Sequence, residues 1–190
     1  MSSVAPAPPV FMNRASRLGT AVLAMVLAGC ITTTHRVHRT SEDILDALNV
    51  SIDIPKGWSV SRSPLHFMNT EMLRVKSVDG VVFDVELTNE EVQDLDGSAA
   101  RVRQTFFRRF NGGRFKTVHQ AVGGIGSTGF TGSIRPEEGG KVFRLLYCCF
   151  NVPGRHVSIQ VQGEESVWLA RQGEIAQLLQ GLHVGESPRP

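Results

Sequence analysis

The chain has 190 residues, 41% of them hydrophobic, and a formal net charge of +2 at pH 7. This size and composition suit one domain with its own core. Two of the 20 basic side chains, Arg14 and Arg17, lie ahead of residue 30, and the rest of the chain carries 18 basic and 18 acidic side chains. The excess of positive charge therefore belongs to the N-terminal stretch, and composition gives no support for a nucleic-acid-binding role.

An apolar run from Leu18 to Ala28 follows these two arginines, and no acid appears before Glu42. A positive start, a short apolar stretch and small residues at a cleavage site are the parts of an export signal. The run is about half of the roughly 20 residues that a membrane-spanning helix needs. Residues 1–29 are therefore predicted to be a signal peptide. Met12 is an alternative start to Met1, because it would give a signal of ordinary length.

The run ends in Leu27-Ala28-Gly29-Cys30, which resembles the lipobox of bacterial lipoproteins. The resemblance implies a diacylglyceryl group on the Cys30 sulfur, cleavage after Gly29 and often acylation, such as with palmitate, of the new N-terminus. Two or more acyl chains hold a protein firmly on a membrane. The alternative is an ordinary cleaved signal with a coincidental cysteine. Ile31 replaces the aspartate linked with inner-membrane retention, which favours the periplasmic face of the outer membrane in a host with two membranes.

The remaining chain is predicted to divide into three parts: a lipidated cysteine and tether over 30–45, a single domain over 46–185 and a disordered tail over 186–190. The tether is polar and lacks apolar periodicity. Its His35 and His38 form an HxxH pair, but no acid or cysteine accompanies them in a fixed element. A solvated tether is therefore a better interpretation than a metal site.

Alternation of apolar and polar residues predicts three strands in the first half of the domain, over 50–54, 72–78 and 81–87. Asp79-Gly80 separates the second from the third, which predicts a two-residue hairpin turn. The third has the clearest alternation, and its predicted inward residues are Val81, Phe83, Val85 and Leu87.

A helix is predicted from Thr88, which forms a capping box with Glu91, to Asn111-Gly112-Gly113. Gly97 lies inside it and is expected to weaken or break it. Apolar residues at steps of three or four form one face: Val92, Leu95, Ala99, Val102, Phe106 and Phe110.

Acids lie at the start of this helix and arginines toward its end, an order that complements the helix dipole. Solvated helix charges are the simpler interpretation of the arginines. The alternative is a basic patch that binds another protein. Its members would be Arg101, Arg108, Arg109, Arg114 and Lys116.

A strand over 115–122 and a glycine-rich passage to residue 132 are predicted next. Gly124, Gly126 and Gly129 match the GxGxxG fingerprint of dinucleotide sites, which requires a helix to open after the glycines. The residues that follow, Phe130 to Ile134, predict a strand instead. We therefore predict a bulged or sharply bent strand and no cofactor.

The last part of the domain is predicted to contain strands over 141–152 and 157–161, separated by a Pro153-Gly154 turn, and a helix over 166–180. Cys148 and Cys149 are neighbours in the first of these strands, so their side chains should point to opposite faces of the sheet as two buried free thiols. The apolar face of the helix is predicted to contain Trp168, Ile175, Leu178, Leu179 and Leu182.

This order of strands and helices, with hairpins between the strands, predicts an α+β fold in which helices cover an antiparallel sheet. Three short segments are similar to the PsbP/DcrB-like family: Pro55-Lys56-Gly57-Trp58, Gly123-Gly124 and Leu178-Leu179-Gln180-Gly181-Leu182. The resemblance spans residues 48–184 and implies an α/β/α sandwich. The family includes photosystem assembly proteins and bacterial lipoproteins, mostly non-enzymatic. It shares no catalytic motif, so the resemblance assigns no catalytic residues.

No pattern in the sequence predicts a catalytic constellation, a cofactor site or a metal site. His66, His119, His156 and His183 are scattered singly, and a dyad of Cys148 or Cys149 with His156 is a weaker interpretation than core packing. Two functions remain open. The first is a non-enzymatic, lipid-anchored envelope protein that binds another envelope protein as an adaptor or assembly factor. The second is a small-ligand carrier or enzyme with a cleft near the glycine-rich strand and the arginines.

Overall fold

The computed structural model of the chain describes residues 40–65, 70–110, 113–135 and 140–186. All of them belong to a unit that runs from Arg39 to Pro190. Several sequence predictions lie outside the described residues: the signal peptide, Cys30, His35, His38, His66, Asn111-Gly112 and residues 187–190 of the tail. No helix in the described part of the chain is long and apolar enough to cross a membrane.

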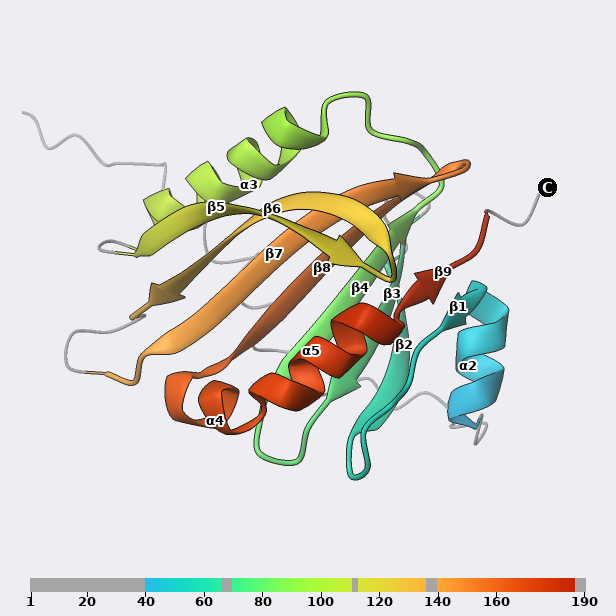
Figure 1. The fold of residues 1–190 in the computed structure, drawn as a ribbon, viewed down its shortest axis with the longest axis horizontal. Helices are drawn as coiled ribbons and strands as arrows, with labels where there is room; N and C mark the ends of the chain where they lie inside the picture. Colours follow the sequence, from blue (N-terminus) through green and yellow to red (C-terminus); the bar gives the residue numbers. More distant parts are fainter. Residues whose placement is uncertain (1–39, 66–69, 111–112, 136–139, 187–190) are drawn as a thin grey trace, which may run out of the picture. The chain divides into compact units, whose positions relative to one another are not determined.

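Seven strands in the described ranges form one antiparallel sheet in the order β2-β3-β4-β8-β7-β6-β5 (Figure 1). After β4 the chain crosses to the far edge of the sheet, forms β5 there, and returns strand by strand to β8 beside β4. The strands are β2 (Ser59–Leu65), β3 (Thr70–Lys76), β4 (Val82–Thr88), β5 (Arg114–Val122), β6 (Ile125–Ile134), β7 (Phe143–Val152) and β8 (Arg155–Glu164). The predicted antiparallel sheet is confirmed.

Helices cover both faces of this sheet (Figure 1). α3 (Leu95–Arg109) packs on β5, β6 and β7, whereas α4 (Glu165–Ala170) and α5 (Gln172–Gly181) contribute to the core on the opposite face. α2 (Ser41–Leu48) contacts β2 and the short strand β1 (Val50–Ser51), which pairs with β9 (His183–Val184). The layers are therefore helix, sheet and helix, and the α+β class with an α/β/α sandwich is confirmed.

Strand alternation divides the core into two hydrophobic clusters, one on each face of the sheet. The larger cluster packs strand residues such as Phe83 and Ile159 against Leu178 of α5. The smaller cluster packs Phe130 and Tyr147 against α3. Cys148 belongs to the first cluster and Cys149 to the second, and both are free thiols with no exposed surface. Their predicted placement on opposite faces is confirmed.

Helix α3 begins later than its sequence suggested. Thr88 is the last residue of β4, and Glu91 accepts a hydrogen bond from the Gly154 N–H (2.7 Å), so the two residues do not form a capping box. Asp94 is the N-cap instead, and its carboxylate accepts a hydrogen bond from the Gly97 N–H (2.8 Å). Gly97 therefore lies in the first turn, and the helix continues through it without the expected break.

Elements at both ends of the domain also differ from the predictions. Residues 41–45, assigned to the tether, belong to α2, which Thr40 and Asp43 cap reciprocally. The strand predicted over 50–54 is reduced to β1, and β9 was not predicted. The helix predicted over 166–180 is interrupted at Arg171, which separates α4 from α5.

The β3–β4 hairpin predicted at Asp79-Gly80 is present, but its loop has one residue more than expected. The Ser77 N–H donates to the Val81 carbonyl (3.0 Å), so Val78, Asp79 and Gly80 form the loop. Gly80 has φ +102°, a value that glycine adopts without strain. The Val78 side chain is 82% exposed and does not face the core.

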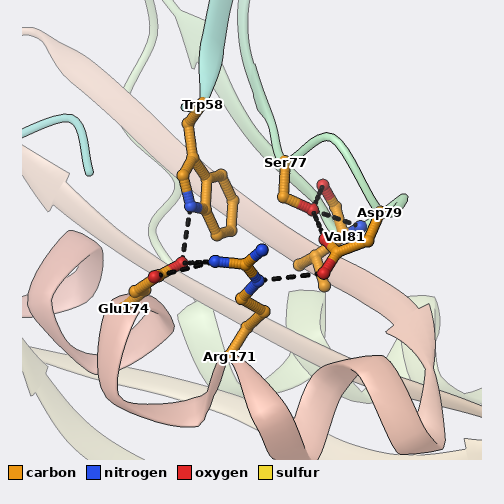
Figure 2. Close-up of polar contacts among 6 residues, drawn as sticks. All are labelled: Trp58, Ser77, Asp79, Val81, Arg171 and Glu174. Atoms are coloured by element: carbon orange, nitrogen blue, oxygen red, sulfur yellow. Dashed lines mark hydrogen bonds and ion pairs between the residues drawn. The ribbon is translucent and has the colours of Figure 1, made fainter. Parts of the chain in front are cut away.

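A polar network joins this hairpin to the junction of α4 and α5 (Figure 2). The Arg171 guanidinium contacts the carboxylates of Asp79 and Glu174, each at 2.9 Å. Glu174 also accepts a hydrogen bond from the indole N–H of the buried Trp58 (2.7 Å), which precedes β2. The Ser77 hydroxyl donates to Asp79 (2.5 Å). The network therefore connects β2, the β3–β4 hairpin and the C-terminal helices.

This network predicts a loss of stability in acid. The hydrogen bond from Ser77 lowers the pKa of the Asp79 carboxyl below its ordinary value of 3.8, and the hydrogen bond from Arg171 adds to the effect. A carboxyl with a lowered folded-state pKa stabilises the fold fully above about pH 4, and this contribution disappears as the pH falls through the lowered value. We expect Asp79→Asn to flatten the dependence of the urea unfolding midpoint on pH between about pH 5 and about pH 2.5. Asp46→Asn, at an exposed position of α2, is the control and should leave that dependence nearly unchanged.

Candidate functional site

A groove runs between α3 and the edge strand β5. Three hollows adjoin along it, with volumes of about 760, 210 and 730 Å³. The first two share Asp96, His119 and Thr128 in their walls, and the second and third share Ala100 and Arg103. The hollows are therefore parts of one depression, which we call the α3–β5 groove. It extends from the β5–β6 hairpin to the start of β5.

Asp94, the N-cap of α3, and Asp96, in its first turn, form the acidic end of the groove. The Asp96 carboxylate accepts a hydrogen bond from the Thr128 hydroxyl of β6 (2.6 Å). Asn151 of β7 fixes the loop before α3, because its side-chain amide donates to the Val92 carbonyl (2.8 Å) and its oxygen accepts from the Val92 N–H (3.2 Å). Contacts distant in sequence thus position this end.

Arg101 and Arg103 of α3 form the arginine end of the groove, and Arg114 borders it where β5 begins. Arg103 donates a hydrogen bond to the Thr117 hydroxyl of β5 (2.6 Å), which ties helix and strand together across the groove. Phe107 lines the same hollow and is 60% exposed, a large apolar surface beside these two arginines. This end therefore offers both positive charge and an apolar contact.

No carboxylate neutralises the arginine end within the described residues, and the sequence contains no Asp or Glu between Asp96 and Glu137. Several other arginines are paired with a carboxylate, as Arg74 is with Asp84 (2.7 and 2.9 Å) and Arg144 with Glu165 (2.9 Å). The cations of the groove therefore remain available to an anionic group from outside the domain.

The structure separates the five residues of the predicted basic patch. Arg101 lines the groove, and Arg114 borders it at the start of β5, but strand alternation directs the Arg114 side chain to the face opposite Phe115. Arg108 is exposed on α3, and the Arg109 guanidinium lies over the Phe110 ring, 5.8 Å from its centroid. Neither Arg108 nor Arg109 lines the hollows of the groove. Only part of the patch thus converges on one surface.

Lys116 lies on the other face of the sheet. Its neighbour Phe115 packs in the cluster under α3, and strand alternation directs the Lys116 side chain to the opposite side. There it borders a separate hollow of about 310 Å³ with Arg114 and Arg144. Lys116 and the α3 arginines therefore cannot act on the same face of the sheet.

The glycine-rich passage forms a hairpin. Gly123 and Gly124 make the β5–β6 turn, with φ of +55° and +82°. Gly126 and Gly129 lie within β6, which continues to Ile134. The predicted strand is present, but its pairing with β5 and β7 runs in continuous register, so the predicted bulge is absent from it. The passage has no helix N-terminus to meet a pyrophosphate.

The chemistry of the buried thiols differs from that of a catalytic dyad. Burial raises the pKa of both Cys148 and Cys149 to about 11, so both are protonated at neutral pH. Burial lowers the pKa of His156, whose Nδ1 lies 3.1 Å from the Asn151 side-chain oxygen. An activated dyad requires a thiol of lowered pKa that hydrogen-bonds to the imidazole. No three His, Cys, Asp or Glu residues are grouped to hold a metal in the part of the chain that the structure describes.

Comparison with known proteins supports the fold. No family model and no curated protein matches the chain. Among solved structures it is similar to cyanobacterial PsbP (CyanoP) from Synechocystis sp. PCC 6803, with a TM-score of 0.50 and 12% identity over 73% of this chain and 88% of that one. The chain therefore has a PsbP-like fold. At this identity the likeness extends to the fold alone.

Two further structures are less similar. One is PA94, a protein of unknown function from Pseudomonas aeruginosa, with a TM-score of 0.44 and 12% identity over 69% of this chain and 98% of that one. The other is LpqN, which is involved in cell envelope biogenesis of Mycobacterium tuberculosis, with a TM-score of 0.47 and 9% identity over 77% of this chain and 98% of that one. Neither likeness is close enough to carry a functional argument.

Proposed function

We propose that the chain is an exported, lipid-anchored envelope protein that acts without catalysis, as an adaptor or assembly factor that binds another envelope protein. In a host with two membranes its place is the periplasmic face of the outer membrane. The run from Leu18 to Cys30 supports the anchor. The observation that carries the binding role is the arginine end of the α3–β5 groove, where Arg101 and Arg103 have no internal carboxylate partner in the described chain.

The state of the buried side chains supports a role without catalysis. Cys148 and Cys149 are inert at neutral pH because burial disfavours their thiolates. Burial also raises the pKa of the Tyr147 hydroxyl, which disfavours its ionised form. Each of these groups packs in a hydrophobic cluster of the sandwich. Their positions are explained by packing, so their presence does not require a reaction.

The lipid anchor predicts that Cys30→Ser abolishes acylation and membrane retention, because only the thiol can form the thioether. The measurement is metabolic labelling with an alkyne-tagged fatty acid, followed by fractionation of the labelled cells. Cys149→Ser, at a buried position, is the control and should keep both label and membrane fraction. Normal labelling and retention of Cys30→Ser would contradict the anchor.

The binding role is tested by chemical cross-linking in intact cells that carry the C-terminally tagged chain. We expect mass spectrometry to identify one dominant envelope protein. The same protein should be lost when all predicted patch residues are changed to glutamine: Arg101, Arg108, Arg109, Arg114 and Lys116. Capture in undiminished amount by this variant would contradict a role for the patch.

A small-ligand carrier or enzyme is the second candidate. The hollow of about 760 Å³ beside Gly126, Ser127 and Thr128 favours it, because its volume is within the range of ligand sites. A small molecule retained by the purified chain, together with no captured partner in cells, would support this candidate against the adaptor.

A further inference from the structure

We propose that the α3–β5 groove binds an extended, acidic segment of the partner, which lies alongside β5 with its carboxylates at the arginine end. This inference rests on the proposed function and specifies the chemistry of the partner. It also limits the binding residues to those of the groove. Arg108 and Lys116, although part of the predicted patch, should not contribute.

The dimensions of the groove suit a short extended peptide. From Asp96 to Phe107 α3 advances about 16 Å, at about 1.5 Å per residue. An extended chain rises about 3.3 Å per residue, so about five residues of a partner would fill this length. The hollows share wall residues along the whole path, and a single segment can therefore occupy them together.

The charge of the groove selects the side chains of the segment and its orientation. Arg101 and Arg103 attract carboxylates at one end. Asp94 and Asp96 disfavour carboxylates at the other end and suit a polar or basic residue. Phe107, exposed beside the arginines, can pack against an apolar residue between the acids of the segment.

The edge of the sheet explains why the segment should be extended. β5 is at the end of the strand order and pairs with β6 on one side, so its other edge has free backbone donors and acceptors within the described sheet. Addition of a peptide strand to such an edge is a common mode of recognition, in which the backbone supplies affinity and flanking side chains supply specificity. The side chains of α3 that line the groove beside this edge would contact the side chains of the segment and select among them.

The test uses the full processed chain in a nonionic detergent and a fluorescein-labelled peptide in which glutamate alternates with valine and threonine around one phenylalanine. We expect saturable binding by fluorescence anisotropy, and weaker binding at higher salt. Arg101→Gln and Arg103→Gln should each weaken binding about 10-fold. Arg108→Gln, on the same helix, and Lys116→Gln, on the same strand, are matched controls and should change it less than about 2-fold.

Four further results decide the inference. The same peptide with lysine in place of glutamate should not bind. N-methylation of alternate backbone amides of the acidic peptide should weaken its binding to the groove. Equal losses in Arg101→Gln and Arg108→Gln, or displacement of the peptide by equimolar inorganic phosphate, would overturn the inference in favour of a diffuse basic surface or a small-anion site. Thermal unfolding of each variant excludes loss of the fold, and Arg101 provides the safer variant because its side chain is exposed.

A failure of the groove inference can be distinguished from a failure of the adaptor role. If a partner is captured in cells but its cross-links map outside the α3–β5 groove, the adaptor role stands and the groove inference falls. If no partner is captured, both fall together.

Discussion

Gly129→Ala should destabilise the domain by about 3 kcal/mol or more, which is large against a typical total of about 5–15 kcal/mol. A Cβ at residue 129 would lie 1.9 Å from the Tyr147 carbonyl oxygen and 2.7 Å from the Cys148 Cα. Both atoms belong to the backbone of β7, so no side chain can rotate away, and β6 must separate from β7. The measurement is the free energy of unfolding in urea, followed by the fluorescence of Trp58 and Trp168.

Gly126→Ala is the matched control for this prediction. Gly126 lies in the same strand, and a Cβ there would meet nothing within 4 Å. We expect a change within about 0.5 kcal/mol of zero. Equal destabilisation by the two substitutions would contradict the close approach of β6 to β7 as the cause, because only Gly129 has backbone within reach.

Strands with strict alternation could be predicted from the sequence, because the buried face of a strand requires an apolar residue at every second position. Phe83, Val85 and Leu87 of β4 all lie in the core as expected. The neighbour of β4 could not be predicted in this way. β4 pairs with β8, about 70 residues later, because α3 carries the intervening chain across the sheet. That pairing depends on tertiary packing.

The start of α3 shows how long-range pairing overrides a local signal. Thr88 and Glu91 have the residue types of a capping box, and Asp94 is an equally good N-cap by type. The structure uses Asp94 because the β4 ladder extends through Thr88, which pairs with His156 of β8. No property of the segment alone distinguishes the two candidates.

The candidate site could be predicted only in part. The cluster of cations was visible in the sequence, but the prediction did not use strand alternation to divide the cations between the two faces of the sheet. The alternation of Arg114, Phe115, Lys116 and Thr117 indicates that Lys116 and Phe115 point to opposite faces. The prediction did not set Arg103 apart from the other arginines of the helix, although it flanks the apolar stripe of α3, a position that places it at the border of the helix with the sheet.

The acidic end of the groove could not be predicted. Asp96 and Thr128 are 32 residues apart in sequence, and their contact requires α3 to lie across β6. The loop that sets the start of α3 depends in turn on Asn151, which is distant from both. These residue types are common on surfaces, and no spacing in the sequence connects them. Only the fold brings them into one groove.

The attachment of α3 determines whether the groove exists, because α3 forms one of its walls. α3 is held to the sheet through the smaller hydrophobic cluster, whose centre is Phe130. The Phe130 ring stacks on Tyr147 at 5.3 Å between centroids and also contacts Phe106 of α3 (5.9 Å) and Phe115 of β5 (5.6 Å). A helix held by a small cluster is expected to open more readily than the remainder of the fold.

Phe130→Ala should therefore cost about 3–5 kcal/mol, the usual range for removal of a buried phenylalanine, and should raise hydrogen exchange in α3 more than in β8. Phe107→Ala is the matched control, since Phe107 lines the groove and is 60% exposed. It should leave the free energy of unfolding within about 0.5 kcal/mol of the unchanged chain, yet weaken binding of the acidic peptide. Urea unfolding, hydrogen exchange and the anisotropy assay measure the three effects. Equal destabilisation by both substitutions would contradict the assignment of Phe130 to the support of the groove and Phe107 to its binding surface.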